Sequence, residues 1–151
     1  MSQNMTVDEI LDFAIDQEQA AVELYTGLAK NAKNPGIKKA FEEFAGEERG
    51  HKAKLKEVKA GNRFLSASSK VIDLKIDTYT VEQELGPDAD YQATLLFAMK
   101  KEKAAFKLYT DLANKTDDTS IRDLLLGLAQ EEAKHKLRFE IEYDDNILAE
   151  N

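Results

Sequence analysis

The two halves of this 151-residue sequence repeat one pattern of chemically reactive side chains. The first half contains Glu48-Arg49-Gly50-His51 and the second contains Glu132-Ala133-Lys134-His135, which hold the only two histidines of the chain. Each motif follows a helix-like segment with one glutamate among its apolar residues, Glu18 in the first half and Glu102 in the second. Each of these glutamates and histidines lies 84 positions from its counterpart. Such a repeat predicts two copies of one supersecondary unit packed together.

Each half has the signals of two long helices joined by a short turn. Thr6-Val7-Asp8-Glu9 has a capping-box pattern, and Asn34-Pro35-Gly36 ends one helix and begins the next. Asp90 and Asp118 stand at the matching positions of the second half and are expected to cap its helices. Apolar residues recur between these signals at helical spacing. The predicted buried positions include Leu11, Ala14, Tyr25, Leu28, Phe41, Phe44, Leu55, Leu95, Ala98, Phe106, Tyr109, Leu112, Leu125, Leu128 and Phe139.

The two hairpins, residues 6–61 and 90–145, are predicted to form one domain over residues 1–151. The fold class is all-α, an antiparallel four-helix bundle whose hairpins are joined by a long crossover at residues 62–89. Within the crossover, Ile72, Leu74 and Ile76 alternate with charged residues. This pattern fits either an extended segment lying on the bundle or a short helix. A connector of this length also makes exchange of hairpins between two chains feasible.

Six side chains of the repeat predict a site for two metal ions inside the bundle. Glutamates three residues before a histidine share one face of a helix with it, and a carboxylate in an apolar stripe is costly unless a cation compensates it. Two divalent cations would neutralise four carboxylates, so metal is expected to stabilise the fold. The oxygen-rich set suits iron or manganese, and zinc also fits. The predicted ligands are Glu18, Glu48, His51, Glu102, Glu132 and His135.

Other repeated residues leave alternatives open. Glu47 and Glu131 precede the histidines by four positions and could bind metal instead, although we favour positions in solvent or behind the ligands. Tyr25 and Tyr109 lie two helical turns after the stripe glutamates, where they either pack in the core or donate a hydrogen bond to a ligand carboxylate. A chance Glu-x-x-His on a surface helix is the alternative to the metal site, and the constant spacing of all six residues argues against it.

Composition limits the partners and the location. The chain has no cysteine, which excludes disulfides and thiolate-bound metals. Its formal net charge of −8 argues against a nucleic acid as its main partner. No apolar stretch reaches the roughly 18 residues needed to span a membrane, and the N-terminus has no signal-peptide pattern. We therefore expect a cytoplasmic protein.

The six residues and their spacing resemble the di-iron domain of the rubrerythrins, in the ferritin-like superfamily, from about Thr6 to Tyr143. The resemblance implies a ferritin-like bundle, a pair of irons held by these residues, reduction of hydrogen peroxide or dioxygen in the response to oxidative stress, and a homodimer. Full-length rubrerythrins carry a rubredoxin-like centre held by four cysteines. Because this chain has no cysteine, its electrons must come from an external donor such as a rubredoxin-type protein.

A second departure concerns the activity. Typical rubrerythrins have a further glutamate one turn past the third-helix ligand, where this chain has Ala105. That glutamate takes part in the movement of iron during turnover, so its replacement counts against a peroxidase but not against the metal site. Non-catalytic iron binding or storage, or iron sensing, is therefore the alternative function.

Overall fold

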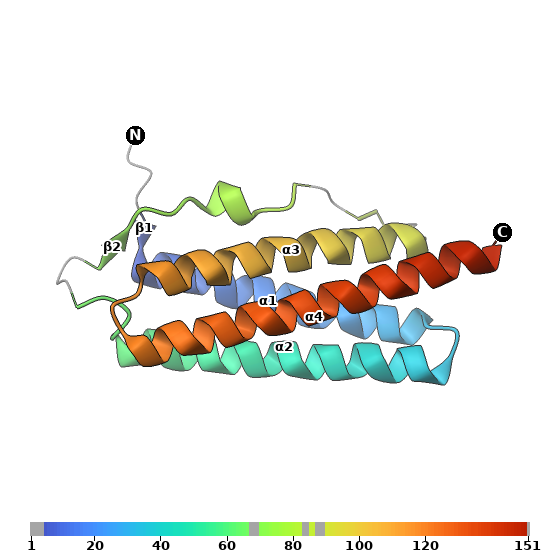
Figure 1. The fold of residues 1–151 in the computed structure, drawn as a ribbon, viewed down its shortest axis with the longest axis horizontal. Helices are drawn as coiled ribbons and strands as arrows, with labels where there is room; N and C mark the ends of the chain where they lie inside the picture. The colour runs from blue at the N-terminus through green and yellow to red at the C-terminus, as the bar shows by residue number, and fades with distance from the viewer. Residues whose placement is uncertain (1–4, 67–69, 83–84, 87–89, 151) are drawn as a thin grey trace.

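Four long helices lie side by side in the computed structural model of the chain (Figure 1). The structure describes residues 5–66, 70–82, 85–86 and 90–150, and only the backbone of residues 147–150. Helices α1 and α2 pack on each other, as do α3 and α4, so the repeat folds as two hairpins. This confirms the predicted all-α bundle. The helices are α1 (Val7–Asn31), α2 (Pro35–Gly61), α3 (Tyr91–Lys115) and α4 (Thr119–Glu150).

A polar side chain caps the start of each helix. Thr6, Asn34, Asp90 and Asp118 each accept a hydrogen bond from the backbone N–H three residues later, at 3.1, 2.8, 2.7 and 3.0 Å respectively. The Glu9 carboxylate accepts in return from the Thr6 N–H at 3.0 Å and completes the capping box. These caps satisfy backbone donors that the first turn of a helix leaves unpaired, and they confirm the four predicted starts.

The crossover combines the two conformations that its sequence pattern left open. Strand β2 (Val71–Ile72) pairs antiparallel with β1 (Met5–Thr6), directly before α1. A short 3-10 helix, η1 (Ile76–Tyr79), then lies against α3, and the described part of the crossover runs along the outside of the bundle (Figure 1). The Tyr79 hydroxyl donates to Asp111 Oδ2 of α3 at 2.6 Å. This bond fastens the middle of the crossover to the second hairpin.

A layer of charged and polar side chains divides the apolar core into two clusters. Along α1, Leu11 and Ala14 belong to one cluster and Ala21 and Tyr25 to the other, with Glu18 between them. Helix α4 passes the two clusters in the same order as α1, and α2 and α3 pass them in the reverse order. We call this division the polar layer, and its members are at most 2% exposed: Glu18, Glu48, His51, Glu102, Glu132 and His135.

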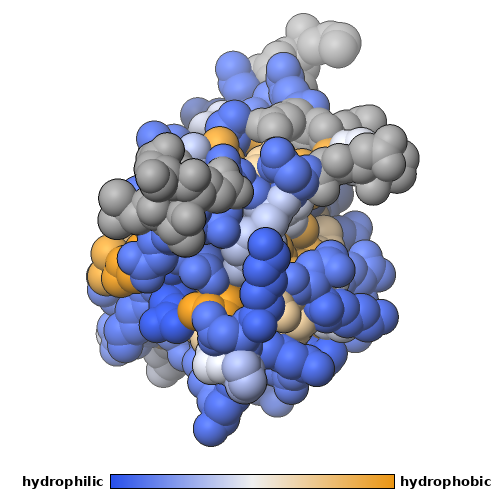
Figure 2. Space-filling view, turned by 90° about the vertical axis from the view of Figure 1, so that its right-hand side faces the viewer, coloured by the Kyte–Doolittle hydropathy of each residue, from blue (hydrophilic) through white to orange (hydrophobic). Residues whose placement is uncertain are grey.

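One predicted core position is wrong. Phe106 is 38% exposed, whereas Leu108, on nearly the opposite side of α3, is 2% exposed. Leu108 belongs to the same apolar cluster as Tyr79 of η1, because the crossover covers that face of the helix. The end of the bundle shown in Figure 2 is mostly hydrophilic where it is coloured, with small apolar patches. None of the described helices is long and apolar enough to cross a membrane.

Candidate metal centre

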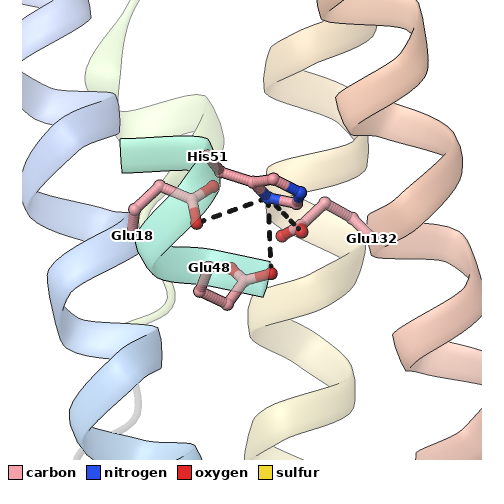
Figure 3. Close-up of side chains that lie close together, drawn as sticks. All are labelled: Glu18, Glu48, His51 and Glu132. Atoms are coloured by element: carbon pink, nitrogen blue, oxygen red, sulfur yellow. Dashed lines mark ion pairs between the residues drawn. The ribbon is translucent and has the colours of Figure 1, made fainter. Parts of the chain in front are cut away.

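Each helix contributes to the polar layer from the middle of its length. Helices α1 and α3 supply one glutamate each, and α2 and α4 supply one Glu-x-x-His pair each. In Figure 3, the carboxylates of Glu18, Glu48 and Glu132 surround the ring of His51 from three different helices. The structure therefore brings all six predicted ligands into one layer.

The layer consists of two overlapping groups of four side chains. In each group, one nitrogen or carboxylate oxygen per residue lies within 4.8 Å of those of the other three. Glu48 and Glu132 belong to both groups and are therefore placed to bridge two ions, while each histidine belongs to one. The groups are Glu18, Glu48, His51 and Glu132, and Glu48, Glu102, Glu132 and His135.

The Nδ1 atom of each histidine faces carboxylates. His51 Nδ1 lies 3.1 Å from Glu132 Oε1 and 3.4 Å from Glu48 Oε1. His135 Nδ1 lies 3.1 Å from Glu48 Oε1 and 3.7 Å from Glu102 Oε2. One imidazole nitrogen and several carboxylate oxygens thus converge at each of the two positions, as a metal ion with mixed nitrogen and oxygen ligands requires.

Buried polar atoms of the layer lack partners, and this observation tests whether metal fits. Leaving a buried polar atom without a hydrogen bond costs about 1–3 kcal/mol, and four clustered carboxylates repel one another. Two divalent cations would remove both costs, and carboxylates with imidazole suit iron, manganese or zinc. The six residues therefore fit a pair of metal ions. Among the described residues, the atoms without a hydrogen-bond partner include His51 Nδ1, His135 Nδ1, Glu18 Oε2, Glu102 Oε2, Glu132 Oε1 and both carboxylate oxygens of Glu48.

Without cations, the layer must hold protons. Burial raises the pKa of Glu18, Glu102 and Glu132, and neighbouring carboxylates raise those of Glu18 and Glu132 further. Burial also opposes ionisation of Glu48, but close contact with His135 and the neighbouring carboxyls lowers its pKa to about 2. Burial likewise opposes a charge on His135, yet Glu102 and Glu48 raise its pKa to about 10. Metal must displace these protons when it binds.

The outer nitrogen of each histidine contacts a glutamate of the other hairpin. His51 Nε2 lies 2.5 Å from Glu131 Oε2, and His135 Nε2 contacts Glu47 Oε2. The Glu47 and Glu131 side chains are 48% and 40% exposed, so they stand between the histidines and solvent. A carboxylate that accepts the Nε2 proton leaves Nδ1 as the nitrogen that faces the metal position. We favoured positions in solvent or behind the ligands, and the structure shows both features, since each glutamate is partly exposed and also contacts a histidine.

The two repeated tyrosines behave differently. The Tyr109 hydroxyl donates to Glu18 Oε1, and burial, followed by the charge of Glu18, raises the pKa of Tyr109. The Tyr25 hydroxyl has no hydrogen-bond partner among the described residues. The centre of the Tyr25 ring lies 5.2 Å from the centre of the Phe139 ring, and the Tyr25 ring packs edge-on to His135. Tyr109 therefore donates a hydrogen bond to a predicted ligand carboxylate, whereas Tyr25 packs in the core.

A small cavity reaches the carboxylates from the seam between α1 and α3. It has a volume of about 20 Å³, and Ala21 and Ala105 contribute to its wall. At the seam, Lys101 Nζ donates a hydrogen bond to Gln17 Oε1. Gln17 and Lys101 were not among the predicted site residues, although they are also 84 positions apart and therefore belong to the same repeat.

The fold and the polar layer define a ferritin-like helical bundle with a candidate carboxylate and histidine site for two metal ions. The family model described as rubrerythrin matches residues 9–143, and the chain belongs to the rubrerythrin family. The sequence matches no curated protein.

Two solved structures share the fold. One is a ferritin-like diiron-carboxylate protein from Thermotoga maritima, with a TM-score of 0.83 and 20% sequence identity over 97% of this chain and 99% of that chain. The other is a hypothetical protein from Pyrococcus furiosus, with a TM-score of 0.74 and 25% identity over 93% of this chain and 89% of that chain. Both alignments extend over nearly the whole bundle.

Proposed function

We propose that the protein is an oxidoreductase that reduces hydrogen peroxide or dioxygen at a pair of irons, with electrons from an external donor. The observation that carries the proposal is the pair of overlapping ligand groups that share Glu48 and Glu132. Two metal ions that shared this carboxylate pair would both be available to one small molecule. The proposed metal ligands are Glu18, Glu48, His51, Glu102, Glu132 and His135.

The irons, when bound, supply two-electron redox chemistry. Reduction of hydrogen peroxide breaks the O–O bond, consumes two electrons and two protons, and yields two molecules of water. The 151 residues contain no cysteine that could hold a rubredoxin-like centre, and the electron donor in this proposal is a rubredoxin-type protein.

The protein's own residues hold and isolate the centre. Glu47 and Glu131 fix the orientation of the two imidazoles by accepting their outer protons. The Tyr109 hydroxyl donates a hydrogen bond to the Glu18 carboxylate. The two apolar clusters exclude bulk water from the two sides of the polar layer. Membership of the rubrerythrin family supports two further proposals, a homodimer and a cytoplasmic location.

Iron analysis followed by rapid mixing tests the proposal. Protein purified without added metal is expected to contain two irons per chain. The reduced, iron-loaded protein should then be oxidised faster by hydrogen peroxide than by dioxygen at equal concentration. A chain that never takes up more than one iron would refute the paired centre, and equal rates with the two oxidants would refute a preference for peroxide.

Non-catalytic iron binding is the second candidate, and Ala105 is the observation that favours it. An alanine at this position provides no carboxylate for iron to move to, and its side chain instead lines the cavity. Storage or sensing predicts iron uptake without turnover of peroxide in the presence of an electron donor. Sizing chromatography separates storage from the rest, because a mineral core requires a hollow shell of many subunits.

A further inference from the structure

The cavity next to the four carboxylates opens towards α1 and α3, and the histidines close the opposite side of the polar layer, at α2 and α4. Its lining includes Glu18, Glu48, Glu102 and Glu132 but neither histidine. The other lining residues belong to α1, α3 and η1. On the side of α2 and α4, the histidines and their bonds to the outer glutamates stand between the carboxylates and solvent. A small molecule that enters through this cavity therefore passes between α1 and α3.

The hydrogen bond from Lys101 to Gln17 crosses this seam. Ala21 and Ala105 leave space next to it, and Tyr79 of the crossover also contributes to the wall. The volume of about 20 Å³ is enough for roughly one water molecule. A ligand of two or three heavy atoms can therefore reach the carboxylates only if the Lys101–Gln17 pair yields or rearranges around it.

Lys101 is the only residue with a positive charge among the described residues that line the cavity. Its hydrogen-bond partner is a neutral amide rather than a carboxylate, and its ammonium lies 6.0 Å from the centre of the Phe97 ring. Two bound divalent cations would neutralise the four carboxylates below, which leaves the Lys101 charge uncompensated at the cavity. An uncompensated positive charge at a narrow opening raises the local concentration of anions.

We infer that Lys101, with Gln17, forms a cationic gate through which small monoanions reach the metal pair. The inference rests on the proposed metal pair and adds to it the entry route and the class of ligand. Azide is a suitable probe because it is a small linear monoanion that binds ferric iron. The hydroperoxide anion belongs to the same class.

Azide titration of the oxidised, iron-loaded protein, followed by optical absorption, tests the gate. Lys101→Gln should weaken azide binding about tenfold, the size expected for the loss of one unit charge close to a bound anion in a partly buried site. Lys103→Gln makes the same change of charge at an exposed position of α3 and should leave the dissociation constant unchanged. Higher salt should weaken azide binding to the wild type more than to Lys101→Gln.

The repeat offers a sharper control, because residues 17 and 101 are counterparts. The double variant Gln17→Lys with Lys101→Gln moves the ammonium to the other side of the same opening and should restore most of the azide affinity. Equal affinities of the wild type and Lys101→Gln, with two irons in each, would overturn the gate and leave the metal pair standing. Absence of azide binding to iron-loaded wild type would also overturn it, whereas absence of the two irons would refute the metal pair and the gate together.

Discussion

The hydroxyl of Tyr109 on α3 donates a hydrogen bond to the Glu18 carboxylate on α1 and so joins the two hairpins inside the core. Tyr25, the counterpart of Tyr109 in the repeat, has no such partner among the described residues. Tyr109→Phe should therefore lower the free energy of unfolding of the metal-free protein by about 1–3 kcal/mol, because Glu18 is left buried without its donor. Tyr25→Phe, the matched control, should change it by less than about 0.5 kcal/mol. Urea denaturation measures both, and equal losses would contradict the asymmetry.

Metal removal is expected to destabilise the bundle, because the unpaired atoms of the polar layer then lose their cations. At a free metal concentration 100 times the dissociation constant, each independent site adds about 2.7 kcal/mol to the free energy of unfolding. Thermal unfolding with iron or manganese, and again after chelation, measures the effect. Glu132→Gln, which changes a carboxylate common to both ligand groups, should reduce the metal-induced rise in Tm, and Glu42→Gln on the exposed surface should not. An unchanged Tm after chelation would contradict the role of metal.

The outer glutamates are expected to control metal affinity without binding metal themselves. Glu131→Gln weakens the acceptor for His51 Nε2, and loss of such a partner lowers metal affinity about 10- to 100-fold. Glu47→Gln should act equally on the site that contains His135. Competition with a coloured chelator measures the affinity. The control is Glu43→Gln, at an exposed position on the same helix as Glu47, and an equal loss in this control would show that surface charge alone is responsible.

The bond between Tyr79 and Asp111 predicts a loss of stability in alkaline solution. Burial raises the pKa of Tyr79 above its usual value of 10.0, and the hydrogen bond to Asp111 raises it further. Because the folded state holds this proton more tightly than the unfolded state, the contribution of Tyr79 is complete below about pH 10 and declines as the pH rises towards the pKa of the folded state. The stability difference between wild type and Tyr79→Phe should thus shrink above pH 10. Urea unfolding between pH 7 and 11 tests this, and a constant difference would contradict it.

The cover that the crossover provides for α3 can be tested with two apolar residues. Leu108→Ala should lower the free energy of unfolding by about 2–5 kcal/mol, the range for a buried leucine, because Leu108 packs in the cluster that contains Tyr79. Phe106→Ala should have a much smaller effect, since Phe106 is 38% exposed. Denaturation curves of the two variants give the comparison. A larger loss of unfolding free energy for Phe106→Ala than for Leu108→Ala would contradict the claim that the crossover covers the Leu108 side of α3.

The helix starts and the six members of the polar layer were predictable because each depends on chemistry within a few residues. Thr6, Asn34, Asp90 and Asp118 cap helices through bonds to the third residue beyond them. Glutamates at helical spacing among apolar residues must face inward once the helix packs. The repeat then places both copies at the same level of the bundle.

The features that escaped prediction depend on contacts between distant segments. The burial of Leu108 and exposure of Phe106 follow from where the crossover lies, which the spacing within α3 does not encode. Tyr25 and Tyr109 have the same local spacing, yet only one reaches a carboxylate, because the hydrogen bond depends on packing across α1 and α3. Alternation around Leu74 could not distinguish a strand from a short helix, since the crossover contains one of each.

The contacts of each histidine with the opposite half have a consequence for how such a centre can arise. His51 contacts Glu131 and Glu132, and His135 contacts Glu47 and Glu48. Each ligand group takes three residues from one hairpin and the fourth from the other, so neither hairpin alone completes a group. A free hairpin could complete the centre only by meeting a second copy, at a rate and yield set by protein concentration. The crossover turns that encounter into an event within a single molecule, so that assembly of the site no longer depends on how abundant the protein is.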